Sequence, residues 1–103
     1  VDITGVEEGD RPSLSLSLLG GNPVRGNSAL NFSLTRTGTV HLHIIDVTGH
    51  VVRTLVDGSM SAGPHAASWN GRDSQGRSLP SGIYFARLDA EGRSLVRRML
   101  MMR

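Results

Sequence analysis

Hydrophobic and polar residues alternate along most of this chain with a period of two. The clearest segment is residues 13–18, in which serine and leucine alternate three times. Successive side chains of a β-strand point to opposite faces, so this pattern predicts a strand with one buried face. No segment fits the helical period of 3.6 better than it fits alternation. Six further strands are predicted, at residues 29–34, 40–47, 51–55, 65–69, 83–88 and 94–102.

Segments rich in glycine, proline and small polar residues separate these strands. Gly20-Gly21-Asn22-Pro23 ends the first strand, and Thr48-Gly49 predicts a two-residue hairpin turn, because glycine adopts the positive φ that such turns require. The remaining predicted turns and loops are residues 37–39, 57–64, 70–82 and 89–92.

Seven short strands at regular spacing predict an all-β fold, an immunoglobulin-like β-sandwich of about seven antiparallel strands. The length of 103 residues corresponds to one domain, which we expect to span residues 13–103. Residues 1–12 are acidic and end in proline, so a linker or an extended lead-in is expected there. Ile3 and Val6 give this lead-in two apolar side chains for contact with a neighbour.

The last predicted strand is apolar on both faces. Leu95, Met99 and Met101 share one face, and Val96, Leu100 and Met102 share the other. The pattern leaves open which face is buried. We expect the second face to contact an upstream domain of the same polypeptide, another protein subunit or a secretion apparatus, because an exposed apolar edge favours aggregation. The candidate interaction surface comprises Ile3, Val6, Arg97, Arg98, Leu100 and Met102.

The loop at residues 70–82 has an aromatic residue near each end. We interpret it as the corner that closes the sandwich, with Trp69 in the core. Asn70 and Asp73 are expected to accept hydrogen bonds from backbone amides. One carboxylate is too few for a calcium loop, whereas an exposed Trp69 would indicate stacking on a sugar. The structural corner comprises Trp69, Asn70, Gly71, Asp73, Gly76, Gly82 and Tyr84.

Composition narrows the possible functions. The net charge of +2 is too small to indicate nucleic-acid binding, and the longest apolar runs are too short to span a membrane. The charge is nevertheless uneven, because residues 1–10 hold four acids and no base, while residues 93–103 hold four arginines and no acid. These arginines fit either an acidic partner or a solvated strand face that discourages edge pairing.

Histidine and serine raise the question of chemistry at a site. His41 and His43 lie two apart on a predicted strand, so their side chains share a face, and two imidazoles can bind one zinc ion. No third ligand has a suitable spacing, and we expect solvent-facing histidines, with no metal and no cofactor. The chain has no cysteine and no Gly-x-Ser-x-Gly motif, so no catalytic residues and no enzyme are predicted.

Several short motifs occur in a recognisable order. They are Asn22-Pro23, Val40-x-Leu-x-Ile-x-Asp-Val-Thr-Gly49, Trp69-Asn-Gly-Arg-Asp-Ser-Gln-Gly76 and Ser81-Gly82-Ile83-Tyr84. Together they resemble the immunoglobulin-like domain of the FlgD family, named for the flagellar hook-capping protein. The resemblance covers about residues 13–103. It extends to the last modules of large secreted bacterial proteins, where the pattern overlaps with the C-terminal sorting domains of type IX secretion.

The resemblance implies a non-catalytic C-terminal module of a secreted or cell-surface bacterial protein. Such a module would mediate attachment, assembly or export. Two alternatives remain open. One is a subunit of an extracellular filament or surface assembly, in which residues 1–12 pair with a neighbour by strand addition. The other is an accessory carbohydrate-binding module.

Overall fold

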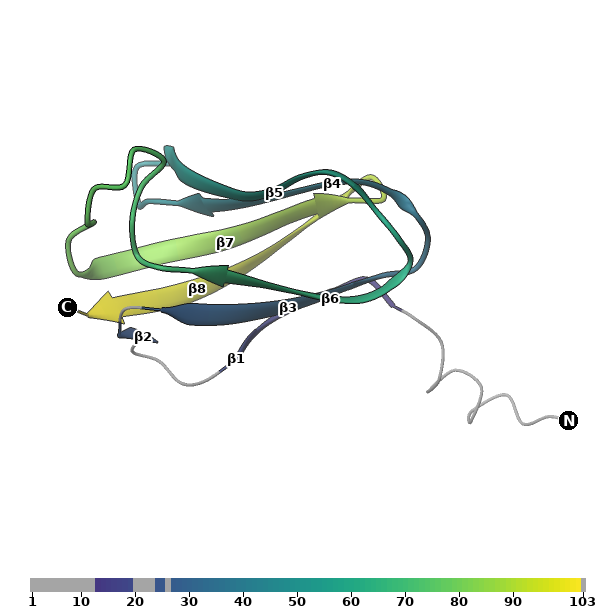
Figure 1. The fold of residues 1–103 in the computed structure, drawn as a ribbon, viewed down its shortest axis with the longest axis horizontal. Helices are drawn as coiled ribbons and strands as arrows, with labels where there is room; N and C mark the ends of the chain where they lie inside the picture. The colour runs from purple at the N-terminus through teal and green to yellow at the C-terminus, as the bar shows by residue number, and fades with distance from the viewer. Residues whose placement is uncertain (1–12, 20–23, 26, 103) are drawn as a thin grey trace, which may run out of the picture.

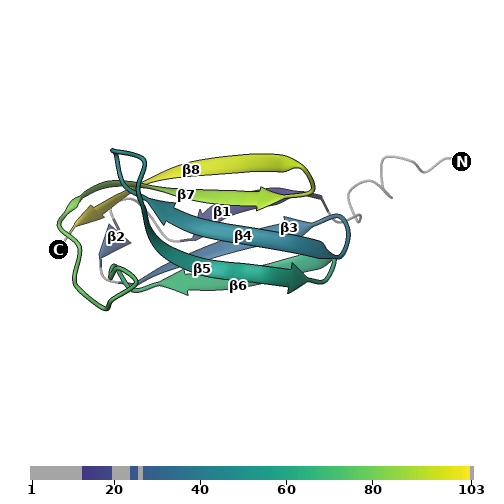
Figure 2. The same cartoon turned by 90° about the horizontal axis from the view of Figure 1, so that it is seen from above.

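The computed structural model describes residues 13–19, 24–25 and 27–102, which form two β-sheets packed face to face (Figure 1). The three-stranded sheet has the order β1-β3-β6, and the five-stranded sheet has the order β2-β8-β7-β4-β5. Figure 2 shows β8, β7, β4 and β5 side by side in this order. The strands are β1 (Ser15–Leu19), β2 (Val24–Arg25), β3 (Ser28–Leu34), β4 (Gly38–Ile45), β5 (Val51–Met60), β6 (Gly63–Trp69), β7 (Gly82–Ala90) and β8 (Arg93–Met102).

The predicted sandwich of seven antiparallel strands is confirmed. The structure adds β2, which pairs with β8 in parallel over two residues. A strand this short leaves no periodic pattern in the sequence, so alternation could not reveal it. None of the described residues forms a helix that is long and apolar enough to cross a membrane.

Alternating apolar side chains from both sheets form the core. In β3, Leu30, Phe32 and Leu34 are buried while the residues between them are partly exposed. The facing sheet contributes alternating residues in the same way, because a strand in a sandwich buries one face only. Its fully or nearly fully buried members are Val40, Leu42, Ile44, Tyr84, Ala86, Leu88, Ala90, Met99 and Met101.

The predicted two-residue turn at Thr48-Gly49 is wrong. The backbone N–H of Asp46 donates to the carbonyl of His50, and that of Gly49 donates to the carbonyl of Asp46, each at 3.0 Å. The loop therefore contains three residues, although Gly49 has the expected positive φ of 91°. The two-residue turn is instead Glu91-Gly92, with φ values of 57° and 71°, between β7 and β8.

The predicted loop at residues 57–64 is also wrong for most of its length. Residues 57–60 belong to β5 and residues 63–64 to β6, which leaves two residues to connect them. Residues 38–41 of β4 pair directly with this part of β5, and that pairing overrides the loop-like composition. Similarly, residues 38–39 and 89–90 were predicted as turns but lie in β4 and β7.

The structure determines how the last strand faces. Met99 and Met101 are fully buried, whereas Leu100 and Met102 are 40% and 37% exposed. Odd-numbered residues of this part of β8 therefore point into the core. The predictions for residues 1–12 and for residues 20–23 lie outside the described residues.

The burial of one face of β8 can be tested by comparing two methionines of that strand. Replacing Met99 by alanine deletes fully buried methylenes, and we expect a loss of about 2–5 kcal/mol in the free energy of unfolding. The same change at Met102 should cost about 0.5 kcal/mol or less, because that side chain is partly solvated. Urea denaturation of both variants measures the difference, and a larger loss at Met102 than at Met99 would show that the strand faces the other way.

Candidate interaction surface and the corner beside it

Trp69 lies at the end of β6, with only 1% of its surface exposed. Its indole N–H donates to the carbonyl of Arg72 at 2.9 Å, so the buried nitrogen has a partner. The ring meets Tyr84 of the opposite sheet edge-on, with centroids 5.4 Å apart. The Tyr84 hydroxyl in turn donates to the carbonyl of Pro80 at 2.7 Å. Two buried aromatics thus fix both ends of the corner loop.

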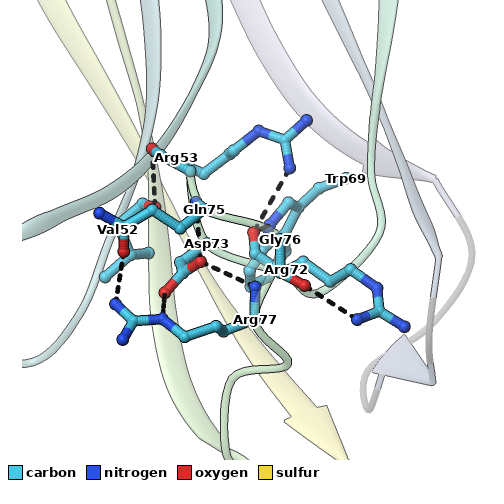
Figure 3. A network of polar contacts seen from close by, with 9 residues as sticks. Val52, Arg53, Trp69, Arg72, Asp73, Gln75, Gly76 and Arg77 are labelled. Atoms are coloured by element: carbon cyan, nitrogen blue, oxygen red, sulfur yellow. Dashed lines mark hydrogen bonds and ion pairs between the residues drawn. The ribbon is translucent and has the colours of Figure 1, made fainter.

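Asp73 organises the middle of the loop (Figure 3). One carboxylate oxygen accepts the backbone N–H groups of Gln75 and Arg77, each at 2.9 Å, and the other accepts Nε of Arg77 at 3.1 Å. These contacts hold the pKa of Asp73 below its ordinary value of 3.8, chiefly through the backbone N–H of Arg77. Gly76 adopts a φ of 85°, which favours glycine. Both oxygens of the Asp73 carboxylate therefore accept hydrogen bonds from within the loop.

Asn70 supports the start of the same loop. Its side-chain oxygen accepts the N–H of Arg72 at 3.1 Å and a guanidinium N–H of Arg53 at 3.4 Å. Gly71 follows with a φ of 77°. Ser74 reaches β5, because its backbone N–H donates to the carbonyl of Val52 at 3.0 Å. The loop is therefore bound to β5 as well as closed on itself.

The outer face of the five-stranded sheet divides into a polar half and an apolar half. Residues directly opposite one another on paired strands share a face. Towards the β7–β8 hairpin the opposed rows are Ser94, Asp89, His41 and Asp57, then Val96, Arg87, His43 and Thr54. Towards the other end they are Arg98, Phe85, Ile45 and Val51, then Leu100 and Ile83.

The second half gathers most of the exposed apolar surface. Seven large hydrophobic side chains are exposed among the described residues, four of them in this half (Val51, Ile83, Leu100 and Met102) and Val47 in the adjoining turn. A hollow of about 300 Å³ beside it is lined in part by Val47, Leu79 and Ile83. Contiguous exposed apolar surface of this kind is typical of protein–protein contact sites. We call this surface the apolar end, and define it as the exposed Val51, Ile83, Leu100 and Met102 together with the half-buried Phe85 and the nearly buried Ile45 between them.

The structure brings together only some of the residues of the candidate interaction surface predicted from the sequence. Arg98, Leu100 and Met102 lie together on the outer face. Arg97 lies opposite the buried Ala86, so it points towards the rim between the sheets. Ile3 and Val6 are outside the described residues. The contribution of β7 was not predicted, although Ile83-Tyr84-Phe85 is apolar at consecutive positions and therefore on both faces.

His41 and His43 share the outer face, as predicted. Their rings are nearly parallel, at an interplanar angle of 3°, with centroids 6.0 Å apart. Nδ1 of His41 lies 2.9 Å from a carboxylate oxygen of Asp57, and Nδ1 of His43 lies 3.0 Å from the Thr54 hydroxyl. Zinc binds imidazole nitrogen at roughly 2.0–2.1 Å, so parallel rings at this separation do not share one ion. Among the described residues, no three His, Asp or Glu side chains form a metal site.

Residues 19–94 match a protein family described as the FlgD Ig-like domain. The chain belongs to this family. The match contains the whole corner of the FlgD Ig-like domain but ends within β8, before Met99 and Met101.

Relatives and solved structures agree with this assignment. The basal-body rod modification protein FlgD of Salmonella typhimurium is 44% identical over 41 residues, which cover 40% of the chain and 18% of that protein. The chain thus matches less than a fifth of this curated relative's length. A crystal structure of dimeric latent PorU from Porphyromonas gingivalis has a TM-score of 0.69 at 18% identity, covering 88% of this chain and 9% of that one.

Two further structures share the fold. FlgD from Xanthomonas campestris has a TM-score of 0.55 at 23% identity, covering 85% of this chain and 63% of that one. PorZ from Porphyromonas gingivalis has a TM-score of 0.55 at 19% identity, covering 98% of this chain and 13% of that one. At these identities the likeness is one of fold. In PorU and PorZ the matching region is a small part of a much longer chain.

Replacing Trp69 by alanine tests the corner of this FlgD Ig-like domain. We expect the free energy of unfolding to fall by about 3–5 kcal/mol, because a fully buried ring is removed and the Arg72 carbonyl loses its donor. Because Trp69 is the only tryptophan, circular dichroism and not tryptophan fluorescence should follow the urea transition. A loss below about 1 kcal/mol would contradict the packing described here.

The lowered pKa of Asp73 predicts a pH dependence. A carboxyl group whose pKa is lowered by folding stabilises the fold above its unfolded pKa, and this contribution is lost as the pH falls through the folded pKa. Asp46 and Glu91 also have lowered pKa values, owing first to hydrogen bonds from Thr48 and Thr35. In urea titrations between pH 6 and about pH 2, Asp73→Asn should be less stable than the wild type at pH 6, and the difference should shrink below pH 3.8. A difference that stays constant with pH would contradict the assigned role.

Proposed function

We propose that this FlgD Ig-like domain is a non-catalytic module of a larger secreted or cell-surface bacterial protein. It acts by binding protein through the apolar end, and so serves attachment, assembly or export. The observation that carries this proposal is the gathering of exposed apolar side chains on one half of one sheet. The other aromatic residues are used internally, because Phe32, Trp69 and Tyr84 are buried.

The known relatives support the class of function. The Xanthomonas campestris FlgD structure concerns hook capping essential for flagellar assembly. PorZ is described as an essential bacterial surface component of the type IX secretion system. A module that joins polypeptides fits these two settings, and no feature of the corner supplies chemistry.

A second candidate is a subunit of an extracellular filament or multi-protein surface assembly. The distribution of charge favours it, because an acidic lead-in and an arginine-rich last strand are complementary between copies. The carbohydrate-binding alternative loses its main argument, because Trp69 is buried and offers no face for a sugar to stack on.

The apolar end can be tested in the full-length protein that contains this domain. Replacing Ile83 and Leu100 together by aspartate places charge on two opposed residues of the surface. We expect the amount of that protein exposed to added protease at the cell surface to fall at least about tenfold, since a charge buried in an apolar contact is strongly unfavourable.

The matched control places the same charges elsewhere. Ser17 and Asn31 are opposed residues on the outer face of the three-stranded sheet, and their replacement by aspartate should leave surface exposure unchanged. Thermal unfolding of each isolated variant checks that it folds. Normal surface exposure of the folded Ile83→Asp, Leu100→Asp variant would remove the proposed role of this surface.

A further inference from the structure

The outer edge of β8 is only partly paired, although β1 of the facing sheet lies close to β8. Within the five-stranded sheet β8 pairs with β7 along its whole length, but with β2 only at Met101 and Met102. Among the described residues, no strand pairs with the other edge of residues 93–99. The carbonyl of Val96 accepts a hydrogen bond from the guanidinium of Arg97 at 2.9 Å, so a side chain occupies a backbone group there.

Two consecutive arginines stand on this edge and point to opposite faces. Arg97 lies opposite Ala86 on the inner side, and Arg98 lies opposite Phe85 on the outer side. Both side chains are exposed. Among the described residues, the recorded ion pairs join other arginines to Glu91, Asp73 and Asp89, and none includes Arg97 or Arg98. A partner lying on one face of the sheet would neutralise only one of them.

We propose that residues 1–12 of a second copy add to this edge as an extra strand, with Glu7 and Glu8 beside the two arginines. The inference rests on the proposed function, because it names a partner for a module that joins polypeptides. Consecutive side chains of a strand alternate between faces, so two adjacent acids place one carboxylate on each side of the sheet. This holds for either direction of the added strand.

Charge also disfavours the simplest alternative contact, in which the β8 edges of two copies pair with each other. Two β8 edges brought together would place arginine against arginine, which is unfavourable. The acidic lead-in has no base within residues 1–10, whereas residues 93–103 contain no acid. The length of the lead-in is sufficient. The unpaired residues 93–99 span roughly 23 Å at about 3.3 Å per residue, and twelve extended residues span about 40 Å. Main-chain hydrogen bonds supply affinity in such contacts, and side-chain matching supplies specificity.

The first experiment measures mass against concentration by sedimentation equilibrium of the whole chain. The wild type should form oligomers that grow with concentration, because a head-to-tail contact does not close by itself. Glu7→Arg, Glu8→Arg and Arg97→Glu, Arg98→Glu variants should each associate at least about tenfold more weakly, since each places like charges together. An equimolar mixture of the two variants should associate again, because the unaltered lead-in of one meets the unaltered edge of the other.

A second variant separates strand addition from attraction between charges alone. Val6→Pro keeps every charge but removes a backbone N–H and restricts the lead-in. It should weaken association at least about tenfold, and hydrogen exchange at the amides of residues 94–98 should slow on wild-type association but not in this variant. Undiminished association of Val6→Pro would overturn strand addition.

The remaining outcomes are also decisive. A wild type that stays monomeric at millimolar concentration overturns the second copy as partner, and protected edge amides in that monomer would assign the site to the same chain's lead-in. Ile83→Asp, Leu100→Asp alters the apolar end without changing the acids or arginines. Loss of surface exposure in that variant, together with a strictly monomeric wild type, would leave the proposed function standing and remove only this inference.

Discussion

The hydrogen bond between the indole N–H of Trp69 and the carbonyl of Arg72 is the contact on which the rest of this structure depends. A buried indole must find an acceptor, and the acceptor here lies three residues further along the chain. That requirement folds the loop back over the core, where Asp73 and Asn70 satisfy its backbone. The loop then meets β5 through Ser74 and carries the chain across to Tyr84 in the other sheet. At this end the two sheets are joined by the loop and by the edge-on contact of Trp69 with Tyr84.

Much of the fold could be predicted from alternation, and the failures have physical causes. Strands such as β3 bury every second residue, so their pattern is visible in the sequence. The end of β5 was missed because Asp57, Gly58 and Ser59 have a loop-like composition, and only pairing with β4 makes them a strand. The register of β5 also shifts twice against β4, which breaks its alternation. The sequence did not show which face of β8 is buried, because both its odd-numbered and its even-numbered residues include apolar side chains.

The candidate site was less predictable than the fold. Leu100 and Met102 were identified because they lie on a strand that is apolar on both faces. Their neighbours Ile45, Phe85 and Val51 were not, because the apolar end is assembled from four strands and exists only once their register is known. The sequence of one strand can show that both of its faces are apolar. It cannot show which other strands place apolar side chains beside it, because that depends on the order and register of the strands in the sheet.

Because side chains at the end of β8 alternate between the core and the surface, its methionines differ in how readily they are oxidised. Thioether sulfur is oxidised to a polar sulfoxide when oxidants reach it. Met99 and Met101 are fully enclosed, whereas Met102 is 37% exposed and belongs to the apolar end. Oxidants that reach the folded domain would therefore alter the apolar end while the core stays reduced. The apolar end would become more polar before the fold is affected, and a reductase acting on methionine sulfoxide could restore it without any refolding.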